Sequence, residues 1–237
     1  MYRFCITLGF PFGANFYSSP HLLAYRSFLK MVKRLSCMNV ENKCIDCPFQ
    51  LDCQYYQITG KNFHGYPGIL FEQVPFDKTL YKENETCDFQ VYLVGNSVKY
   101  KAYIEVFFQE YLQYRLATFP FQIKKIETED ISEGQFTTDW IHINTPIESE
   151  DFQTCFNEMV TYYNLNYNTK YPLLHSALKQ NKTKSIRTQI VKLPTKHVKV
   201  SGYVFNVFGQ IKLSRDFLWI GIGKYNFIGG GKIAIKN

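Results

Sequence analysis

Four cysteines stand close together near the start of the sequence, in the spacing C-x6-C-x2-C-x5-C. Structural zinc is held by four ligands in a tetrahedron, and a Cys-x2-Cys pair is typical of such sites. The spacing predicts a structural zinc with no open position for catalysis, although four reduced structural cysteines would give the same pattern. The candidate ligands are Cys37, Cys44, Cys47 and Cys53.

A second group of chemistry-bearing residues lies at the end of the sequence, where residues 221–235 contain five glycines and two lysines. Glycine lets a backbone approach a ligand closely, and N–H groups flanked by lysine can cradle phosphate oxygens. A flexible turn is the alternative interpretation. The candidate phosphate-binding residues are Gly223, Lys224, Gly229, Gly230, Gly231 and Lys232.

Basic residues are concentrated in the two ends of the chain. Residues 1–37 carry five basic residues and no acid, whereas residues 38–169 carry nine basic and nineteen acidic residues. Residues 170–237 carry thirteen basic residues and the single acid Asp216. Such segregation favours a polyanionic partner, with nucleic acid as the first choice. The candidate contacts are Arg26, Lys33, Arg34, Lys182, Lys184, Arg187 and Lys192.

The length of 237 residues allows one large domain or two small ones. The sequence has no run of 18 apolar residues, so we expect no spanning helix and no membrane partner. Its N-terminus alternates like a strand and lacks the features of a signal peptide. We therefore expect a cytoplasmic protein whose cysteines are reduced or metal-bound.

Hydrophobic periodicity predicts one order of elements twice over, strand–helix–strand–strand–helix–strand, which is the ferredoxin-like order. The first set has strands near 2–8, 69–74, 88–95 and 119–128, and helices near 21–35 and 99–115. The second set has strands near 135–143, 186–193, 197–213 and 232–236, and helices near 149–167 and 216–222.

The predicted fold is therefore α+β, with tandem ferredoxin-like (RNA-recognition-motif-like) domains and a C-terminal glycine-rich loop. The first domain would span residues 1–130 and carry an inserted cysteine-rich loop at 37–60. The second would span residues 131–237. It would carry a basic hairpin, formed by the strands expected near 186–193 and 197–213, and the glycine-rich loop.

Three stretches carry a resemblance to a known family. They are Leu22-Leu-Ala-Tyr-Arg-Ser-Phe-Leu, the cysteine block ending Cys47-Pro-Phe-Gln-Leu-Asp-Cys-Gln-Tyr-Tyr, and Ser201-Gly-Tyr-Val-Phe-Asn-Val-Phe-Gly-Gln-Ile leading into Gly223-Lys224 and Gly229-Gly-Gly-Lys-Ile. With the tandem ferredoxin-like order, nearly the whole chain resembles the RAMP superfamily. Within it, the chain resembles the cysteine-containing branch of the CRISPR precursor-RNA processing endoribonucleases.

The resemblance implies cleavage of CRISPR repeat RNA without a catalytic metal, leaving a 5′-hydroxyl and a 2′,3′-cyclic phosphate. Other CRISPR effector subunits are further candidate partners. His64 lies between the cysteine-rich loop and the strand expected near 69–74. It is the first candidate for general acid or base, because related enzymes often place a catalytic histidine a few residues before that strand. His21 is the second candidate. Lys30 and Arg26 are candidates for stabilising phosphorane charge, and Tyr25 for orienting the 2′-OH.

Two other functions share these features. A non-catalytic RAMP subunit of an effector complex would have the same charge pattern and glycine loop but need no histidine. A zinc-stabilised protein-interaction module would instead use its acidic middle segment to contact protein partners.

Overall fold

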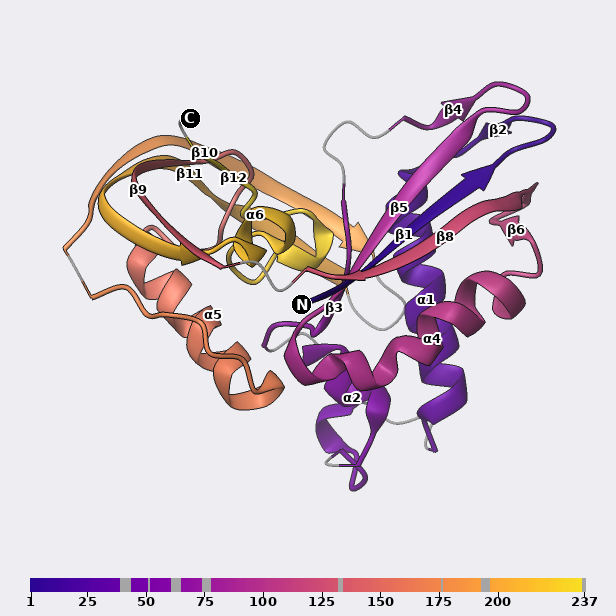
Figure 1. Cartoon of the computed structure of the whole chain (residues 1–237), viewed down its shortest axis with the longest axis horizontal. Helices are drawn as coiled ribbons and strands as arrows, with labels where there is room; N and C mark the ends of the chain where they lie inside the picture. Colours follow the sequence, from indigo (N-terminus) through magenta and orange to yellow (C-terminus); the bar gives the residue numbers. More distant parts are fainter. Residues whose placement is uncertain are drawn as a thin grey trace.

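Two four-stranded antiparallel sheets lie side by side in the computed structural model (Figure 1). The structure describes residues 1–38, 44–50, 52–60, 65–73, 78–131, 134–175, 177–192 and 197–235. The strand orders are β3-β5-β1-β8 in the first sheet and β10-β11-β9-β12 in the second. Both orders are those of a ferredoxin-like unit, so the predicted fold class is confirmed.

The first sheet is built from β1 (Tyr2–Gly9), β3 (Ile69–Phe71), β5 (Thr86–Leu93) and β8 (Gln122–Asp130). Helices α1 (Pro20–Ser36), α2 (Gln54–Ile58) and α4 (Lys101–Val106) lie on one side of it (Figure 1). The short elements are β2 (Ala14–Asn15), η1 (Cys44–Asp46), β4 (Leu80–Tyr81), η2 (Gly95–Tyr100), η3 (Phe107–Tyr111), β6 (Arg115–Leu116) and β7 (Phe119–Pro120).

Helix α1 begins as its sequence predicts. The Ser19 hydroxyl accepts a hydrogen bond from the Leu22 N–H at 3.2 Å, and Pro20 occupies the first turn. The buried residues of α1 end at Val32, so its last turn extends beyond the core. Leu35 in that last turn is therefore 59% exposed.

Two other segments of the first half differ from the expectation. The helix expected over 99–115 consists of the 3-10 turn η2, helix α4 and the π-helical turn η3. In that wider turn the consecutive rings of Phe107 and Phe108 are both buried. The strand expected from Phe119 begins later, because Phe119–Pro120 pairs with Arg115–Leu116 as a small hairpin.

The second sheet contains β9 (Gln135–Ile143), β10 (Lys179–Lys192), β11 (His197–Ser214) and β12 (Ile233–Ile235). Helix α5 (Phe152–Tyr167) packs on one face, with α6 (Asp216–Ile220) beside it and η4 (Asn226–Ile228) following. The Asp151 carboxylate caps α5 by accepting from the N–H groups of Gln153 and Thr154. No helix of the described residues is long and apolar enough to cross a membrane.

Buried tyrosines of α5 join the two halves. The Tyr163 hydroxyl donates to the carbonyl of Pro67 at 3.1 Å and accepts from the side-chain amide of Asn226 at 2.9 Å. One turn later, the Tyr167 hydroxyl lies 3.1 Å from the carbonyls of both Gln57 and Tyr66. These bonds satisfy backbone carbonyls that the junction removes from water.

A second set of contacts joins the far end of the chain to the first sheet. The Lys232 ammonium donates to the carbonyl of Trp219 at 2.7 Å and lies 3.4 Å from a Glu72 carboxylate oxygen. Burial lowers the pKa of Lys232, and Glu72 opposes that shift. The Trp219 ring also packs against the Arg3 guanidinium and the Tyr92 ring. The second half is thus held on the first by specific polar contacts as well as by apolar burial.

The Tyr163 hydroxyl gives a direct test of this junction. Tyr163→Phe should lower the free energy of unfolding by about 1–3 kcal/mol, because it leaves the buried groups of Pro67 and Asn226 without this partner. Urea denaturation would measure the change. The control Tyr103→Phe removes an exposed hydroxyl bonded to Gln54 and should change stability by under about 0.5 kcal/mol. Equal losses in the two variants would contradict a special role for the junction.

Candidate functional site

The glycine-rich segment is packed inside the protein. Gly223, Gly229, Gly230 and Gly231 are all buried. The Gly231 N–H donates to the carbonyls of Thr145 and Pro146, and a Cβ at this position would lie 1.6 Å from a carbonyl oxygen. Glycine is therefore required here by close backbone packing and by a φ of +66°. The expected exposed phosphate cradle is corrected: the N–H groups of this segment bond within the fold.

An internal carboxylate occupies part of the expected anion site. Glu148 Oε2 accepts from the Lys224 N–H at 2.9 Å and lies 2.6 Å from where a Cβ on Gly223 would sit. The other oxygen, Oε1, lies 3.5 Å from the Cys155 thiol. Backbone amides and a carboxylate form a stable pair without any ligand. The Lys224 N–H, one of the groups expected to meet phosphate, is therefore bonded to a carboxylate of the protein itself.

The two lysines of this segment have different environments. The Lys232 side chain is 17% exposed and is held by Glu72 and the Trp219 carbonyl, so it serves the junction between the sheets. The Lys224 side chain is exposed. Of the two, Lys224 is the one positioned to meet a phosphate.

Two of the predicted catalytic side chains are buried. His21 is 5% exposed, its Nε2 lies 2.8 Å from the backbone oxygen of Asp88, and its ring packs on Phe89. Tyr25 is 1% exposed and packs between Phe71 and Phe227, and burial raises its pKa well above the ordinary value. Neither side chain can meet a phosphate or a 2′-OH in this structure. Their predicted catalytic roles are corrected, because α1 turns both residues into the core.

His64, the first catalytic candidate, lies outside the described residues, but both flanks of its segment are placed. The Gly65 N–H donates to the Gly60 carbonyl at 3.0 Å. A Cβ on Gly65 would lie 2.2 Å from a ring atom of Tyr162, so this aromatic ring packs directly against the glycine backbone. Gly65, the residue that follows His64, therefore lies against α5.

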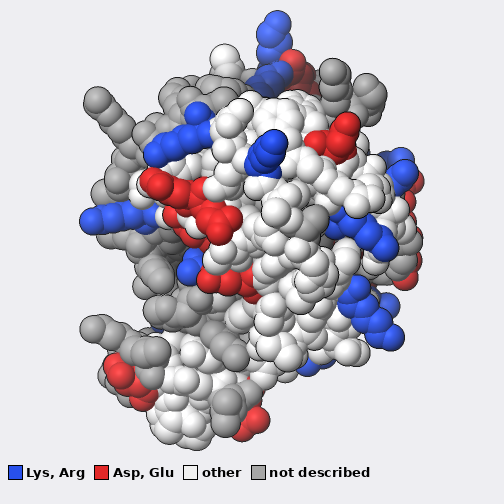
Figure 2. Space-filling model, turned by 90° about the vertical axis from the view of Figure 1, so that its left-hand side faces the viewer, with Lys and Arg blue, Asp and Glu red and all other residues white. Residues whose placement is uncertain are grey.

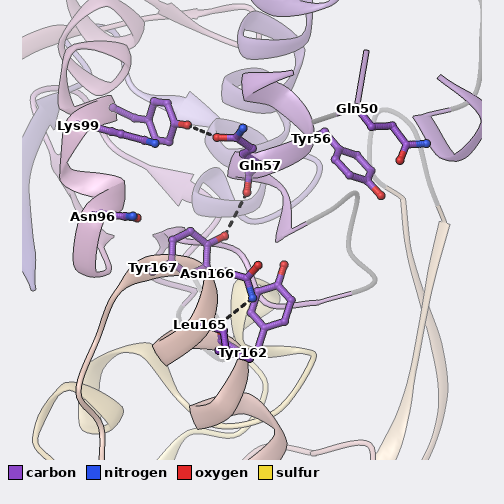
Figure 3. A pocket seen from close by; sticks show the side chains of 10 residues that line it. Gln50, Tyr56, Gln57, Asn96, Lys99, Tyr162, Leu165, Asn166 and Tyr167 are labelled. Carbon is purple, nitrogen blue, oxygen red and sulfur yellow. Dashed lines mark hydrogen bonds between the residues drawn. The ribbon is translucent and has the colours of Figure 1, made fainter. Parts of the chain in front are cut away.

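Next to Tyr162 is a cavity of about 320 Å³ between the two halves (Figure 3). That volume is at the lower end of the range for ligand pockets. Side chains from α2, η2 and α5 line it, so it exists only because the halves are docked. The lining residues are Gln50, Tyr56, Gln57, Asn96, Lys99, Tyr100, Tyr162, Leu165, Asn166 and Tyr167.

The wall of this cavity combines aromatic rings with amides and one cation. The Tyr100 hydroxyl donates to Gln57 Oε1 at 2.6 Å, and the Lys99 ammonium lies 4.9 Å from the centre of the Tyr100 ring. Burial raises the pKa of Tyr162 to about 12, so its hydroxyl stays protonated at neutral pH. Flat rings, amides and a lysine are groups that can hold a nucleobase and a nearby phosphate.

These cavity residues were not singled out in the sequence. The sequence predicts α5 as a helix and contains the neighbouring tyrosines Tyr162, Tyr163 and Tyr167. Several tyrosines on one helix could have indicated that this helix contacts the other half of the chain as well as its own sheet. Which surface those tyrosines meet depends on the docking of α5 against α2 and η2.

The basic residues of α1 remain accessible. Lys30 and Arg34 are exposed, and Arg26 and Lys33 are half-buried. Arg26 and Lys30 are one turn apart and share a face of the helix, as expected.

Figure 2 shows another face, where basic side chains are scattered and acidic ones gather among them. The described part of that face is therefore not one continuous basic patch.

The basic hairpin forms as β10 and β11. Lys182 is exposed, lies 3.3 Å from a Glu150 carboxylate oxygen and sits 4.3 Å from the centre of the Tyr203 ring. Lys184, Arg187 and Lys192 lie on β10, and their side chains fall outside the described residues. Their assignment to RNA binding stays a prediction.

The four cysteines of the predicted zinc site share one neighbourhood. Burial raises the pKa of the Cys44 thiol, nearby Lys33 opposes the shift, and the other three thiols raise the pKa further. All four are half-buried and free of disulfides. Among the described residues, no three histidine, cysteine, aspartate or glutamate side chains are grouped closely enough to hold a metal. Four thiols are a ligand set that zinc prefers. The described thiols do not lie close enough together to surround one ion in this structure.

Solved structures with the same fold cover essentially the whole chain. A Cas6 product complex has a TM-score of 0.54 at 10% identity, covering 99% of each chain. An RAMP protein binding different RNA substrates has a TM-score of 0.52 at 11% identity, covering 100% of each chain. A Cas6-related protein from Pyrococcus furiosus has a TM-score of 0.51 at 13% identity, covering 99% of this chain and 98% of that one.

Comparisons of sequence give a second result. No curated protein matches the chain. The family model AF_1859_N, described as an N-terminal domain, matches residues 26–151, which is more than half of the sequence. This match includes most of α1, the cysteine block, strands β3, β5 and β8 of the first sheet, and β9 of the second. The chain therefore belongs to the AF_1859_N family and has the fold of the Cas6 and RAMP proteins.

Proposed function

We propose that this chain is an endoribonuclease that binds CRISPR repeat RNA and cuts it to guide RNA. The observation that carries the proposal is the fold shared with a Cas6 product complex over 99% of both chains. The thirteen basic residues and one acid of residues 170–237 support it, because a polyanionic ligand explains an excess of that size.

In the proposed reaction the 2′-oxygen of one nucleotide attacks the adjacent phosphorus. A base takes the 2′-OH proton, the bond from phosphorus to the 5′-oxygen breaks, and an acid protonates that leaving oxygen. The products are a 2′,3′-cyclic phosphate and a 5′-hydroxyl. Protein side chains supply both proton transfers, and cations stabilise the charge on the phosphorane.

His64 is the proposed proton-transfer residue. With His21 buried, it is the remaining histidine of the predicted pair, and Gly65, the next residue, packs on the Tyr162 ring that lines the cavity of Figure 3. Lys30 and Arg26 on α1 are the proposed cations. A nucleotide seated against Tyr162 would lie beside Gly65, and we infer from this that the cavity helps to place the scissile phosphate.

The test is cleavage of labelled repeat RNA in EDTA, with both product ends mapped. His64→Ala should slow single-turnover cleavage by about a hundredfold or more, because it removes one proton transfer from the transition state. Affinity for the repeat should change little. A 2′-deoxy nucleotide at the scissile position should abolish cutting by the wild type, because the nucleophile is then missing.

His175→Ala is the matched control, since this exposed histidine lies outside the proposed site. It should cut at the wild-type rate. Cleavage of the 2′-deoxy substrate, or a requirement for added metal, would contradict the mechanism. Wild-type rates in His64→Ala would remove His64 from it.

A non-catalytic RAMP subunit is the second candidate function. The burial of His21 and Tyr25 favours it, because such a subunit needs no accessible catalytic side chain. One solved RAMP protein with this fold binds different RNA substrates. The same assay separates the two functions: a binding subunit would retain the repeat RNA and leave it uncut.

We also propose that Cys37, Cys44, Cys47 and Cys53 bind one structural zinc. The four thiols share one neighbourhood, and their spacing includes the Cys-x2-Cys pair typical of structural zinc sites. Zinc would fix the segment between α1 and α2, which precedes the His64 segment in sequence and lines the cavity through Gln50.

Purified, freshly reduced protein should contain about one zinc per chain. Cys44→Ser combined with Cys47→Ser should lose the metal and lower the melting temperature, because zinc-binding free energy contributes to folding. Elemental analysis and calorimetry measure the two effects. Cys5→Ser, a half-buried thiol on β1, is the control and should keep its zinc. Absence of zinc from the wild type would refute the site.

A further inference from the structure

One face of the second sheet is covered by α5, and the other face is not part of that packing. The Phe205 ring contacts Phe152 of α5 with ring centres 6.3 Å apart, and Val207 and Ile141 are fully buried. Side chains alternate between the faces of a sheet along each strand. The residues between these buried positions on β9 and β11 therefore lie on the opposite face.

The strand register arranges that opposite face into two rows. In the first row, Trp140 of β9 pairs with Phe208 of β11, which pairs with Lys179 of β10. In the second, His142 of β9 pairs with Asn206 of β11, and Asn206 pairs with Asn181 of β10. An aromatic row ending in a lysine thus lies next to a polar row. We call Trp140, Phe208, His142 and Asn206 the β9/β11 face.

The aromatic side chains of this face are open to solvent. Phe208 is 38% exposed, an unusual state for a phenylalanine on a central strand, and Trp140 and His142 are partly exposed. The Trp140 and His142 rings are nearly parallel, at 10°, with centres 6.2 Å apart. Opposite residues on neighbouring strands have Cβ atoms about 4.5–5.5 Å apart. The Trp140 and Phe208 side chains, which pair across the strands, are therefore neighbours on this face.

The polar row has a defined hydrogen-bonding character. His142 Nδ1 lies 2.8 Å from Asn206 Oδ1. An amide oxygen only accepts, so Nδ1 carries the proton and Nε2 of the neutral ring is an acceptor. Next to the aromatic rings there is thus an acceptor held in a fixed orientation, suited to an amino group of a nucleobase.

We propose that the β9/β11 face stacks two unpaired RNA bases, one on Trp140 and one on Phe208, beside the acceptor of His142. The charge of this part of the chain favours nucleic acid over a protein partner: Lys179 of the aromatic row is exposed, and residues 170–237 contain one acid. The bases must be unpaired, because a duplex hides their flat surfaces. This inference rests on the proposed RNA-binding function and adds a site distinct from the cavity of Figure 3.

Tryptophan fluorescence tests the stacking directly. The chain has two tryptophans, and the indole nitrogen of Trp219 is buried at the junction between the halves. Adding single-stranded repeat RNA should quench the fluorescence of Trp140. In Trp140→Phe this quench should disappear while affinity stays close to that of the wild type, because phenylalanine can still stack.

Affinity gives the second readout. Trp140→Ala combined with Phe208→Ala should weaken binding of single-stranded repeat RNA by about tenfold or more and leave its salt dependence unchanged, since no phosphate contact is lost. The charge reversal of Lys182, Lys184 and Arg187 to Glu should lower both affinity and salt slope. Phe12→Ala is the matched control, because Phe12 is 81% exposed in the loop between β1 and β2.

The outcomes separate this inference from the proposed function. RNA binding with no quench of Trp140 and normal affinity in the double alanine variant would refute the β9/β11 face and leave the function standing. Absence of any RNA binding by the wild type would refute both. A change of oligomeric state in the double variant, with RNA affinity unchanged, would identify this face as a protein interface and overturn the inference.

Discussion

The docking of two sheets through a tyrosine-rich helix is the constraint on which the rest of the structure depends. Each half of the chain completes its own ferredoxin-like sheet, but α5 must also cover part of the first half. Burying that surface removes the carbonyls of Gln57, Tyr66 and Pro67 from water. Unpaired, each would cost free energy comparable to a lost hydrogen bond, and the hydroxyls of Tyr163 and Tyr167 prevent this.

The same constraint decides the role of the glycine-rich segment. Asn226 in this segment is a partner of Tyr163, and Lys232 at its end reaches the first sheet. The backbone N–H groups of Gly231 and Lys232 both bond to Thr145, so they are not available to a ligand. Glu148 completes the arrangement by occupying the amide at Lys224. Accessible positive charge is therefore left to side chains such as Lys30, Lys179 and Lys224.

Docking also creates surfaces that neither half has alone. The cavity of Figure 3 takes its walls from α2 and η2 on one side and from α5 on the other. Tyr162, one of its lining residues, also packs against Gly65. On the second sheet, α5 covers one face only, so the opposite face keeps its aromatic row accessible. The pocket at the junction and the accessible aromatic row on the second sheet thus both follow from how α5 packs.

The sequence by itself determined the element order and hence the tandem ferredoxin-like fold, because hydrophobic periodicity is a local feature. It also located the cysteine block and the exposed basic residues of α1. Only the tertiary structure decided that His21 and Tyr25 are buried, since which face of α1 meets the sheet depends on packing against β5 and β3. It likewise decided that the glycines serve chain packing and that Tyr162 lines a cavity. Those outcomes depend on contacts between residues far apart in sequence, which no local pattern records.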